Sequence, residues 1–261
     1  MLDETIITKA IIESYTKDLI DNLKVDVIIV GAGPSGLTAS RFLAEKGLKT
    51  IIFERKLSIG GGMLGGGMMF NKIVVQKEAK RILDLYNIKT EEYEPNYYIA
   101  GAIESVVKLT AYAIDVGVKI FNLISVEDVK INDSNKVTGV VINWSAVELA
   151  KLHVDPMTIE SKYVIDATGH DSEIVNIILR KIPDAKLKTL TGKKIGELPM
   201  NAEKGEHMLL DMTKEIYPGL YVTGMTASAC SGGPRMGPIF GGMLLSGEKV
   251  AQLIIDKQKK A

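Results

Sequence analysis

The segment VDVIIVGAGPSG, residues 25–36, decides the fold of this chain. Residues 25–30 are mostly β-branched, which predicts a buried strand. The Gly-x-Gly-x-x-Gly that follows predicts a tight turn into a helix over residues 37–46, which Gly47 ends. Residues 49–54 predict a second strand that finishes in an acid, Glu54. A strand, a glycine turn, a helix and an acid in this order and at this spacing are typical of a dinucleotide-binding unit.

Each glycine of the turn is expected to have its own role. Gly31 allows the tight turn, Gly33 lets a pyrophosphate approach the backbone, and Gly36 lets the helix pack closely on the strand. The helix N-terminus offers free N–H groups and a partial positive charge to the phosphates. Glu54 lies about 20 residues further on, where it would accept hydrogen bonds from ribose hydroxyls. The alternative is a glycine turn in an unrelated strand–helix unit, which the complete set of strand, helix and acid disfavours.

Composition bounds the class of protein. Apolar residues make up 46% of the 261 residues, so a sizeable core is possible. Acids and bases balance at 32 each, which argues against a nucleic-acid partner or a membrane-surface role. No apolar run reaches the ~18 residues of a bilayer-spanning helix, and the early acids do not resemble a signal peptide. The single cysteine, Cys230, excludes an intrachain disulfide and a cysteine-based metal cage, so a reducing cytoplasm is the simplest compartment.

Hydrophobic periodicity predicts the remaining elements. An N-terminal helix over residues 4–22, within residues 1–24, is expected to pack on the sheet or on a neighbouring subunit. An inserted hairpin is expected at about 125–144. Residues 90–98 are expected to be an irregular acidic connection and residues 181–207 a polar excursion or lid. Further helices are expected over 76–86, 103–116 and 175–180, and further strands over 118–122, 163–169 and 220–224; residues 145–152 carry no assignment.

Together these elements predict an α/β protein with a flavoprotein-like, glutathione-reductase-type dinucleotide-binding fold. A central parallel sheet would carry the hairpin as an inserted antiparallel β layer. The sequence contains no internal repeat and no low-complexity linker, so we expect residues 1–261 to form a single dinucleotide-binding domain.

The stretch after Glu54 is also unusual. Arg55 and Lys56 could reach a phosphate or a carboxylate, although a solvated loop is the alternative. Residues 60–67 then contain six glycines in eight positions, which cannot make a stable helix or strand. A flexible linker would be rich in polar residues, whereas Met, Leu and Phe lie in and beside this stretch. We therefore expect a loop whose backbone comes close to a bound ligand.

A metal site is one interpretation of two short segments. His153-Val-Asp155-Pro is predicted to be a tight turn, and His170 follows the predicted strand 163–169 at the edge where open α/β sheets bind ligands. If the two turns meet, Asp155 and His170 offer an oxygen and an imidazole nitrogen with open positions, which suits Fe(II) or a similar ion. The alternative for His170 is a hydrogen-bonded structural histidine.

A second glycine-rich turn lies within residues 232–247 and opens the last helix. Arg235 stands in this turn between Pro234 and Met236. A guanidinium gives a planar, bidentate grip on a small carboxylate, so Arg235 is a candidate carboxylate clamp. A surface arginine is the alternative.

The chain resembles thiamine thiazole synthases of the sulfide-dependent type over nearly its whole length. The resemblance rests on the leader helix, the fingerprint, Phe53-Glu-Arg55, the 60–67 loop and three further motifs. Those three motifs are HVDP at 153–156, DATGHD at 166–171 and GPRMGP at 233–238. Ordinary flavoprotein reductases lack this combination.

This resemblance implies an enzyme that makes the ADP-linked thiazole carboxylate precursor of thiamine from NAD, glycine and a sulfur source. NAD would be a consumed substrate and Fe(II) the cofactor. Asp155 and His170 would bind Fe(II), and Arg235 would bind the glycine carboxylate. The family also implies a homo-octamer whose subunits share sites. The fingerprint and pocket residues that would hold the nucleotide are Gly31, Gly33, Ser35, Gly36, Glu54, Arg55, Gly62, Val126, His153, Asp155 and Met225.

Some members of this family act only once, because a cysteine of the enzyme gives up its own sulfur in the reaction. This chain has His153 at the position of that cysteine. An imidazole cannot donate sulfur, so the resemblance implies free sulfide as the donor and repeated turnover. As a catalytic residue His153 would carry protons; otherwise it is a pocket wall. An FAD-dependent oxidoreductase of the same fold, a sugar-phosphate isomerase and a non-enzymatic nucleotide sensor are the alternatives.

Overall fold

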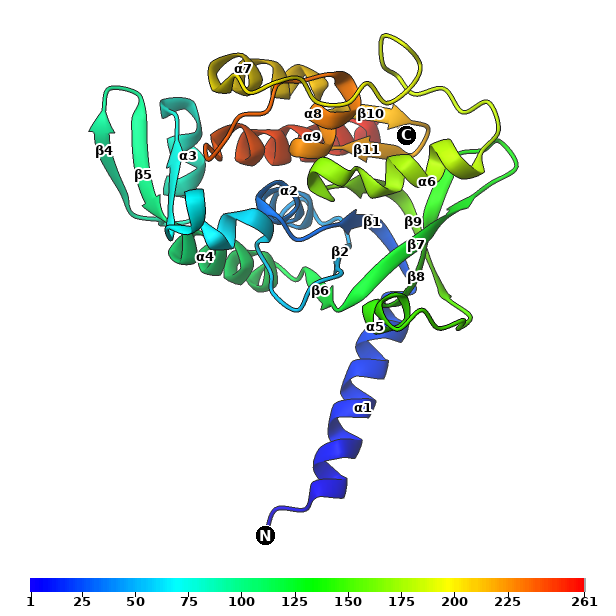
Figure 1. Cartoon of the computed structure of the whole chain (residues 1–261). Coiled ribbons are helices and arrows are strands. Elements are labelled where there is room, and N and C mark those ends of the chain that lie inside the picture. The colour runs from blue at the N-terminus through cyan, green and yellow to red at the C-terminus, as the bar shows by residue number, and fades with distance from the viewer. Residues whose placement is uncertain (261) are drawn as a thin grey trace.

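A twisted, mostly parallel sheet forms the centre of the protein, which we describe from a computed structural model over residues 1–260 (Figure 1). The strand order is β10-β11-β9-β1-β2-β6, and every neighbouring pair is parallel except β10 with β11. Strand β1 lies between β2 and β9, so the fingerprint turn leaves from the middle of the sheet. The bounds are β1 Lys24–Val30, β2 Thr50–Glu54, β6 Lys119–Asn122, β9 Met157–Asp166, β10 Lys214–Tyr217 and β11 Leu220–Val222.

The predicted hairpin is confirmed as an antiparallel layer joined to this sheet. It consists of β7 (Ile124–Ile131) and β8 (Val137–Trp144), and β8 pairs antiparallel with β9. The predicted fold class, a flavoprotein-like dinucleotide-binding fold with an inserted antiparallel layer, is therefore confirmed.

Both faces of the central sheet are buried. Successive side chains of a strand point to opposite faces, so Val27 and Ile29 of β1 enter one core cluster and Ile28 and Val30 enter the other. The first cluster includes α2 (Pro34–Ala44), α4 (Ala102–Asp115), α3 (Lys77–Leu85) and α9 (Gly241–Lys259), and the second includes α6 (Glu173–Lys181), α7 (Ala202–Met212) and α8 (Met225–Ser231).

A small antiparallel sheet corrects the prediction of an irregular connection at residues 90–98. Strand β5 (Tyr97–Gly101) pairs with both β3 (Lys72–Val75) and β4 (Thr90–Glu94). Most side chains of β4 are exposed, so the strand has no apolar alternation that a sequence pattern could reveal. Asn96 adopts φ 74°, which Asn tolerates better than most residues, and so makes the turn between the two strands.

Helix α1 (Glu4–Asp21) forms as predicted but stands away from the body (Figure 1). Only its C-terminal part touches the sheet: the Tyr15 ring lies 5.9 Å from that of Phe121, and Asp18 pairs with Lys119 at 3.0 Å. The apolar side chains Ile6, Ile7, Ile11 and Ile12 are exposed. Only a small part of helix α1 therefore packs on the sheet. Packing on a neighbouring subunit stays a prediction.

Several shorter elements differ from the sequence-based expectation. The glycine-rich loop forms no α-helix or strand, as expected, but it contains two 3-10 turns, at Gly61–Gly65 and Gly67–Met69. Residues 145–152 include a short helix, α5 (Ser145–Leu149), and the expected excursion ends within α7. Strand β10 and helix α8 were not predicted. Among residues 1–260, no helix is both long and apolar enough to cross a membrane.

Candidate functional site

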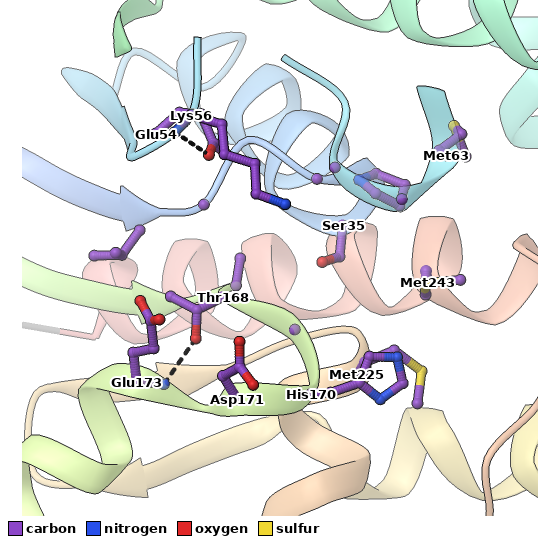
Figure 2. Close-up of a pocket in the computed structure, with 18 of the residues that line it drawn as sticks. Ser35, Glu54, Lys56, Met63, Thr168, His170, Asp171, Glu173, Met225 and Met243 are labelled. Atoms are coloured by element: carbon purple, nitrogen blue, oxygen red, sulfur yellow. Dashed lines mark hydrogen bonds between the residues drawn. The ribbon is translucent and has the colours of Figure 1, made fainter. Parts of the chain in front are cut away.

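One cavity of about 510 Å³ opens where β1, β2 and β9 end, within the usual size range for small-molecule sites (Figure 2). This is the edge at which open α/β sheets bind ligands. Its walls come from the fingerprint turn, the segment after β2, the glycine-rich loop, the start of β7, the turn after β9 and the second glycine-rich turn. The predicted site residues among them are Gly31, Gly33, Ser35, Glu54, Arg55, Gly62, Val126, His170, Met225 and Arg235.

The three fingerprint glycines have different surroundings. A Cβ on Gly31, which adopts φ +105°, would lie 2.5 Å from the carbonyl oxygen of Ala167. A Cβ on Gly36 would lie 2.2 Å from the carbonyl oxygen of Gly31, so this glycine permits helix–strand packing and does not line the cavity. A Cβ on Gly33 would meet nothing within 4 Å. Gly33 therefore presents open backbone to the cavity, as a pyrophosphate site requires.

Glu54 is held rigidly at the end of β2. One carboxylate oxygen accepts a hydrogen bond from the backbone N–H of Ala32 at 2.9 Å, and the other accepts one from that of Lys56, also at 2.9 Å. Each oxygen keeps further acceptor capacity, so the buried carboxylate can still receive ribose hydroxyls. The bond to Ala32 also ties the acid to the fingerprint turn.

The two basic residues after Glu54 behave differently. The Arg55 guanidinium pairs with Glu173 and lies 3.4 Å from Asp171, so acids from the far wall already neutralise it. The Lys56 side chain extends along the cavity toward Ser35 and takes part in none of the ion pairs formed within residues 1–260 (Figure 2). Lys56 is therefore the better placed of the two to meet a phosphate.

His170 is presented by a turn that the buried carboxylate of Asp166 fixes. Asp166 accepts hydrogen bonds at 3.0 Å from the backbone N–H groups of Thr168, Ile174 and Val175, which caps α6. The His170 side chain lines the cavity and is 50% exposed. Its Nδ1 lies 2.7 Å from a carboxylate oxygen of Glu197, a residue in the segment expected to be an excursion.

His153 and Asp155 do not meet His170 within one chain, so the predicted Asp155–His170 metal site stays a prediction that requires two subunits. Both are exposed, they lie outside the walls of the cavity, and residues 152–156 form no turn. They precede β9, whereas His170 follows its C-terminal end, and ten strand residues span about 33 Å at ~3.3 Å each. Within the described residues of one chain, no group of three or more His, Cys, Asp or Glu side chains is arranged to hold a metal ion.

Arg235 lines the same cavity as Glu54 and stands in a turn whose backbone is held on both sides. Its N–H donates to the carbonyl of Leu198 at 3.1 Å, and its carbonyl accepts from the N–H of Asn201 at 2.9 Å. The side chain is exposed and takes part in no ion pair over residues 1–260. The guanidinium is thus available for an anionic ligand.

Two further groups bear on the chemistry of the cavity. Burial raises the pKa of the Glu173 carboxyl, and the neighbouring Arg55 opposes that shift. The thiol of Cys230 is buried in α8, and burial raises its pKa to about 12. At neutral pH this thiol is protonated, and the protonated form is a poor nucleophile.

Sequence reasoning selected neither Glu197, the partner of His170, nor several residues that line the cavity. Glu197 had no signal at all, since it lies in a polar segment of no clear periodicity, 27 positions from its partner. The others lie in or beside motifs already noticed; they are Met63, Thr168, Asp171, Glu173, Phe240 and Met243.

Known proteins resemble this chain closely. Residues 8–240 match the model of the Thi4 family. A thiamine thiazole synthase of Methanosarcina barkeri (strain Fusaro / DSM 804) is 55% identical over 259 residues, covering 99% of each chain. One from Pyrococcus furiosus (strain ATCC 43587 / DSM 3638 / JCM 8422 / Vc1) is 54% identical over 257 residues, covering 98% of this chain and 99% of the relative. The crystal structure of Thermovibrio ammonificans THI4 superposes with a TM-score of 0.96 at 47% identity, covering 99% of this chain and all of the other.

Proposed function

Because the chain belongs to the Thi4 family, we propose that it makes the ADP-linked thiazole carboxylate precursor of thiamine from NAD, glycine and free sulfide. The reaction is Fe(II)-dependent and each enzyme molecule turns over many times. NAD is a substrate that is taken apart, so it is not a cofactor that is regenerated.

The observation that carries this proposal is a single cavity that joins a dinucleotide cradle to His170 and Arg235. The ADP half fits the cradle: Gly33 and Ser35 face the pyrophosphate, and Glu54 accepts the ribose hydroxyls. Gly31, Gly62, Val126 and Met225 line the same space. His170 lines the same cavity as this cradle, so the nicotinamide ribose would be within the space that His170 borders.

Fe(II) would be held by His170 and by Asp155, and the residues fit that ion in part. An imidazole whose Nδ1 is hydrogen-bonded to a carboxylate is the usual arrangement of a metal-binding histidine, and His170 has it with Glu197 at 2.7 Å. Nitrogen and carboxylate oxygen donors suit Fe(II). When bound, the ion would supply Lewis-acid activation at open coordination positions.

Asp155 must then come from another copy of the chain, since it lies at the far end of β9 from His170. We propose a homo-oligomer, an octamer as in the family, in which one subunit donates residues 153–155 to the cavity of its neighbour. The exposed isoleucines of α1 support association between copies, because contiguous exposed apolar side chains mark interaction surfaces.

Arg235 would hold the carboxylate of glycine, and free sulfide would supply the sulfur. The guanidinium of Arg235 is free of acidic partners within residues 1–260 and can grip a carboxylate with two hydrogen bonds. The sulfur must come from outside the chain, since the only thiol, Cys230, is buried and protonated. His153 stands where a sulfur-donating cysteine would be. Its role is then either to carry protons or to form part of the pocket wall.

The experiment that tests this function is mass spectrometry of the purified protein and its products. The nucleotide that copurifies is identified first, and the protein is then incubated anaerobically with NAD, glycine, sulfide and Fe(II). We expect an ADP-linked thiazole that disappears when any one reactant is left out. A yellow protein that retains FAD would instead support an oxidoreductase of the same fold, and conversion of a sugar phosphate without Fe(II) or glycine would support an isomerase.

A further inference from the structure

We propose that Glu197 is a positioning residue that fixes the tautomer and orientation of His170. The carboxylate oxygen of Glu197 lies 2.7 Å from Nδ1 of His170. A carboxylate only accepts hydrogen bonds, so Nδ1 must carry a proton, and in the neutral ring Nε2 then keeps its lone pair. The inference deepens the proposed metal role of His170 and rests on it for its functional consequence, but the tautomer itself follows from this contact alone.

The carboxylate is in a position to hold the ring because its own segment is fixed on both sides. Glu197 is 17% exposed, whereas His170 is 50% exposed, so the acid is the more enclosed partner. The backbone N–H groups of Ile195 and Leu198, on either side of Glu197, donate to the carbonyls of Cys230 and Gly233 at 3.1 and 2.9 Å. The segment is therefore attached to the end of α8 and to the turn that follows it.

The same segment contacts both the turn that carries His170 and the turn that carries Arg235. Lys194 donates from Nζ to the carbonyl of Asp171 at 2.8 Å, next to His170 in the chain. Leu198 accepts a hydrogen bond at 3.1 Å from the backbone N–H of Arg235. Residues 194–198 thus brace His170 against the turn that carries Arg235, and Glu197 is the member that touches the imidazole.

The chain offers internal references for a spectroscopic test, because it has only three histidines. Nδ1 of His207 lies 2.7 Å from the backbone carbonyl of Glu203, which also only accepts, so this ring should share the Nδ1–H tautomer. His153 is exposed, and an exposed imidazole in water exchanges between tautomers.

The first test is nitrogen NMR of protein labelled with ¹⁵N-histidine, free of metal and at a pH above which the imidazole signals of the wild type no longer change. We expect His170, assigned through His170→Gln, to show a protonated Nδ1 and an unprotonated Nε2. Glu197→Ala should shift His170 toward a tautomer mixture while leaving His207 unchanged. Glu197→Gln should keep the wild-type pattern, because the amide oxygen can still accept from Nδ1. A His170 signal that is the same in wild type and Glu197→Ala would overturn the proposal.

The second test is titration of the full-length protein with Co(II) alone, followed by visible absorption. Loss of such an outer-shell partner typically weakens metal binding about 10- to 100-fold, and we expect that for Glu197→Ala. Glu197→Gln should lose much less, and Glu203→Ala, an exposed acid that does not touch His170, should match wild type. If Gln is as damaging as Ala, Glu197 is itself a ligand and the positioning role is wrong. If His170→Ala binds Co(II) like wild type, the proposed metal role fails while the tautomer result still stands.

Discussion

Asp155 and His170 lie beyond opposite ends of strand β9, whose ten residues span about 33 Å at ~3.3 Å each. Only one of them, His170, faces the cavity of its own chain. If the two bind one ion, the site belongs to two subunits and cannot exist in a monomer.

Mixing two inactive variants tests this shared site. Asp155→Ala and His170→Ala should each abolish thiazole formation, whereas co-expression of the two should restore part of it. With random assembly about a quarter of the sites would combine an intact Asp155 with an intact His170, since the two halves come from different copies. Product formation by the co-expressed oligomer is measured against each variant alone. Lack of any recovery in a well-assembled oligomer would argue against sites made by two subunits.

Arg235 is expected to govern the use of glycine. Removal of a charged hydrogen-bonding partner costs about 1.5–3 kcal/mol, so Arg235→Ala should raise the KM for glycine by roughly tenfold to a hundredfold. The KM for NAD should change little, because Arg235 is not among the residues expected to hold the nucleotide. Arg235→Lys keeps the charge but loses the bidentate fork, so its KM for glycine should lie between those of the wild type and Arg235→Ala. Equal increases in both KM values would mean that Arg235 does not bind the amino acid.

Gly33 and Gly36 form a matched pair for the fingerprint. A methyl group at Gly33 meets open space, so Gly33→Ala should leave the thermal midpoint unchanged while weakening binding of NAD and ADP. A methyl group at Gly36 would lie 2.2 Å from a backbone oxygen, and such overpacking destabilises by about 1–3 kcal/mol. Calorimetry and nucleotide titration separate the two effects. A Gly33→Ala protein that binds NAD normally would place the pyrophosphate elsewhere.

Lys56 is expected to contact a phosphate. Its side chain reaches along the cavity and forms no ion pair within residues 1–260, whereas Arg55 is paired with acids. Lys56→Ala should weaken binding of ADP and make that binding less sensitive to salt, because one charge contact is lost. Lys46, an exposed basic residue at the end of the first βα unit, supplies the control substitution to Ala. Unchanged salt dependence in the Lys56 variant would remove this residue from the phosphate site.

Cys230 should matter for stability at high pH and not for sulfur supply. Its pKa is raised by burial from 9.0 to about 12, so above pH 9 the unfolded chain loses this proton while the folded chain keeps it. The free energy of unfolding therefore falls as the pH rises from 9 to 12, by about 1.4 kcal/mol per pH unit from this group. Denaturant titrations of wild type and Cys230→Ala should show a shallower fall in the variant. The variant should also still make thiazole from sulfide; loss of product with a folded chain would implicate the thiol.

The parts of the fold that the sequence predicted well are those in which burial imposes a pattern. The apolar run 25–30 lies between two other strands and is covered on both faces. Strand β8 of the hairpin near 125–144 buries five of its eight residues. The β4–β5 hairpin was missed because the side chains of β4 are largely exposed and neither strand shows an alternation of buried and exposed residues. The partner of α1 could not be identified either, since most of its apolar side chains touch nothing within the chain.

The site residues divide in the same way, into those that the sequence could predict and those that it could not. Gly33 and Glu54 were predictable because the backbone geometry of a dinucleotide cradle demands those residues at that spacing. Glu197 was not, since its contact with His170 depends on how a polar segment folds back across 27 positions. The separation of Asp155 from His170 within one chain was also beyond reach, because it depends on the length and direction of β9.

The most direct test of the proposed function is the number of thiazole molecules formed per chain, combined with the intact mass of the chain afterwards. The assay contains NAD, glycine, sulfide and Fe(II) under anaerobic conditions. We predict several products per chain and a protein whose mass has not changed. At most one product per chain, with a protein that has lost a sulfur atom, would contradict the account, as would product formation that does not require sulfide.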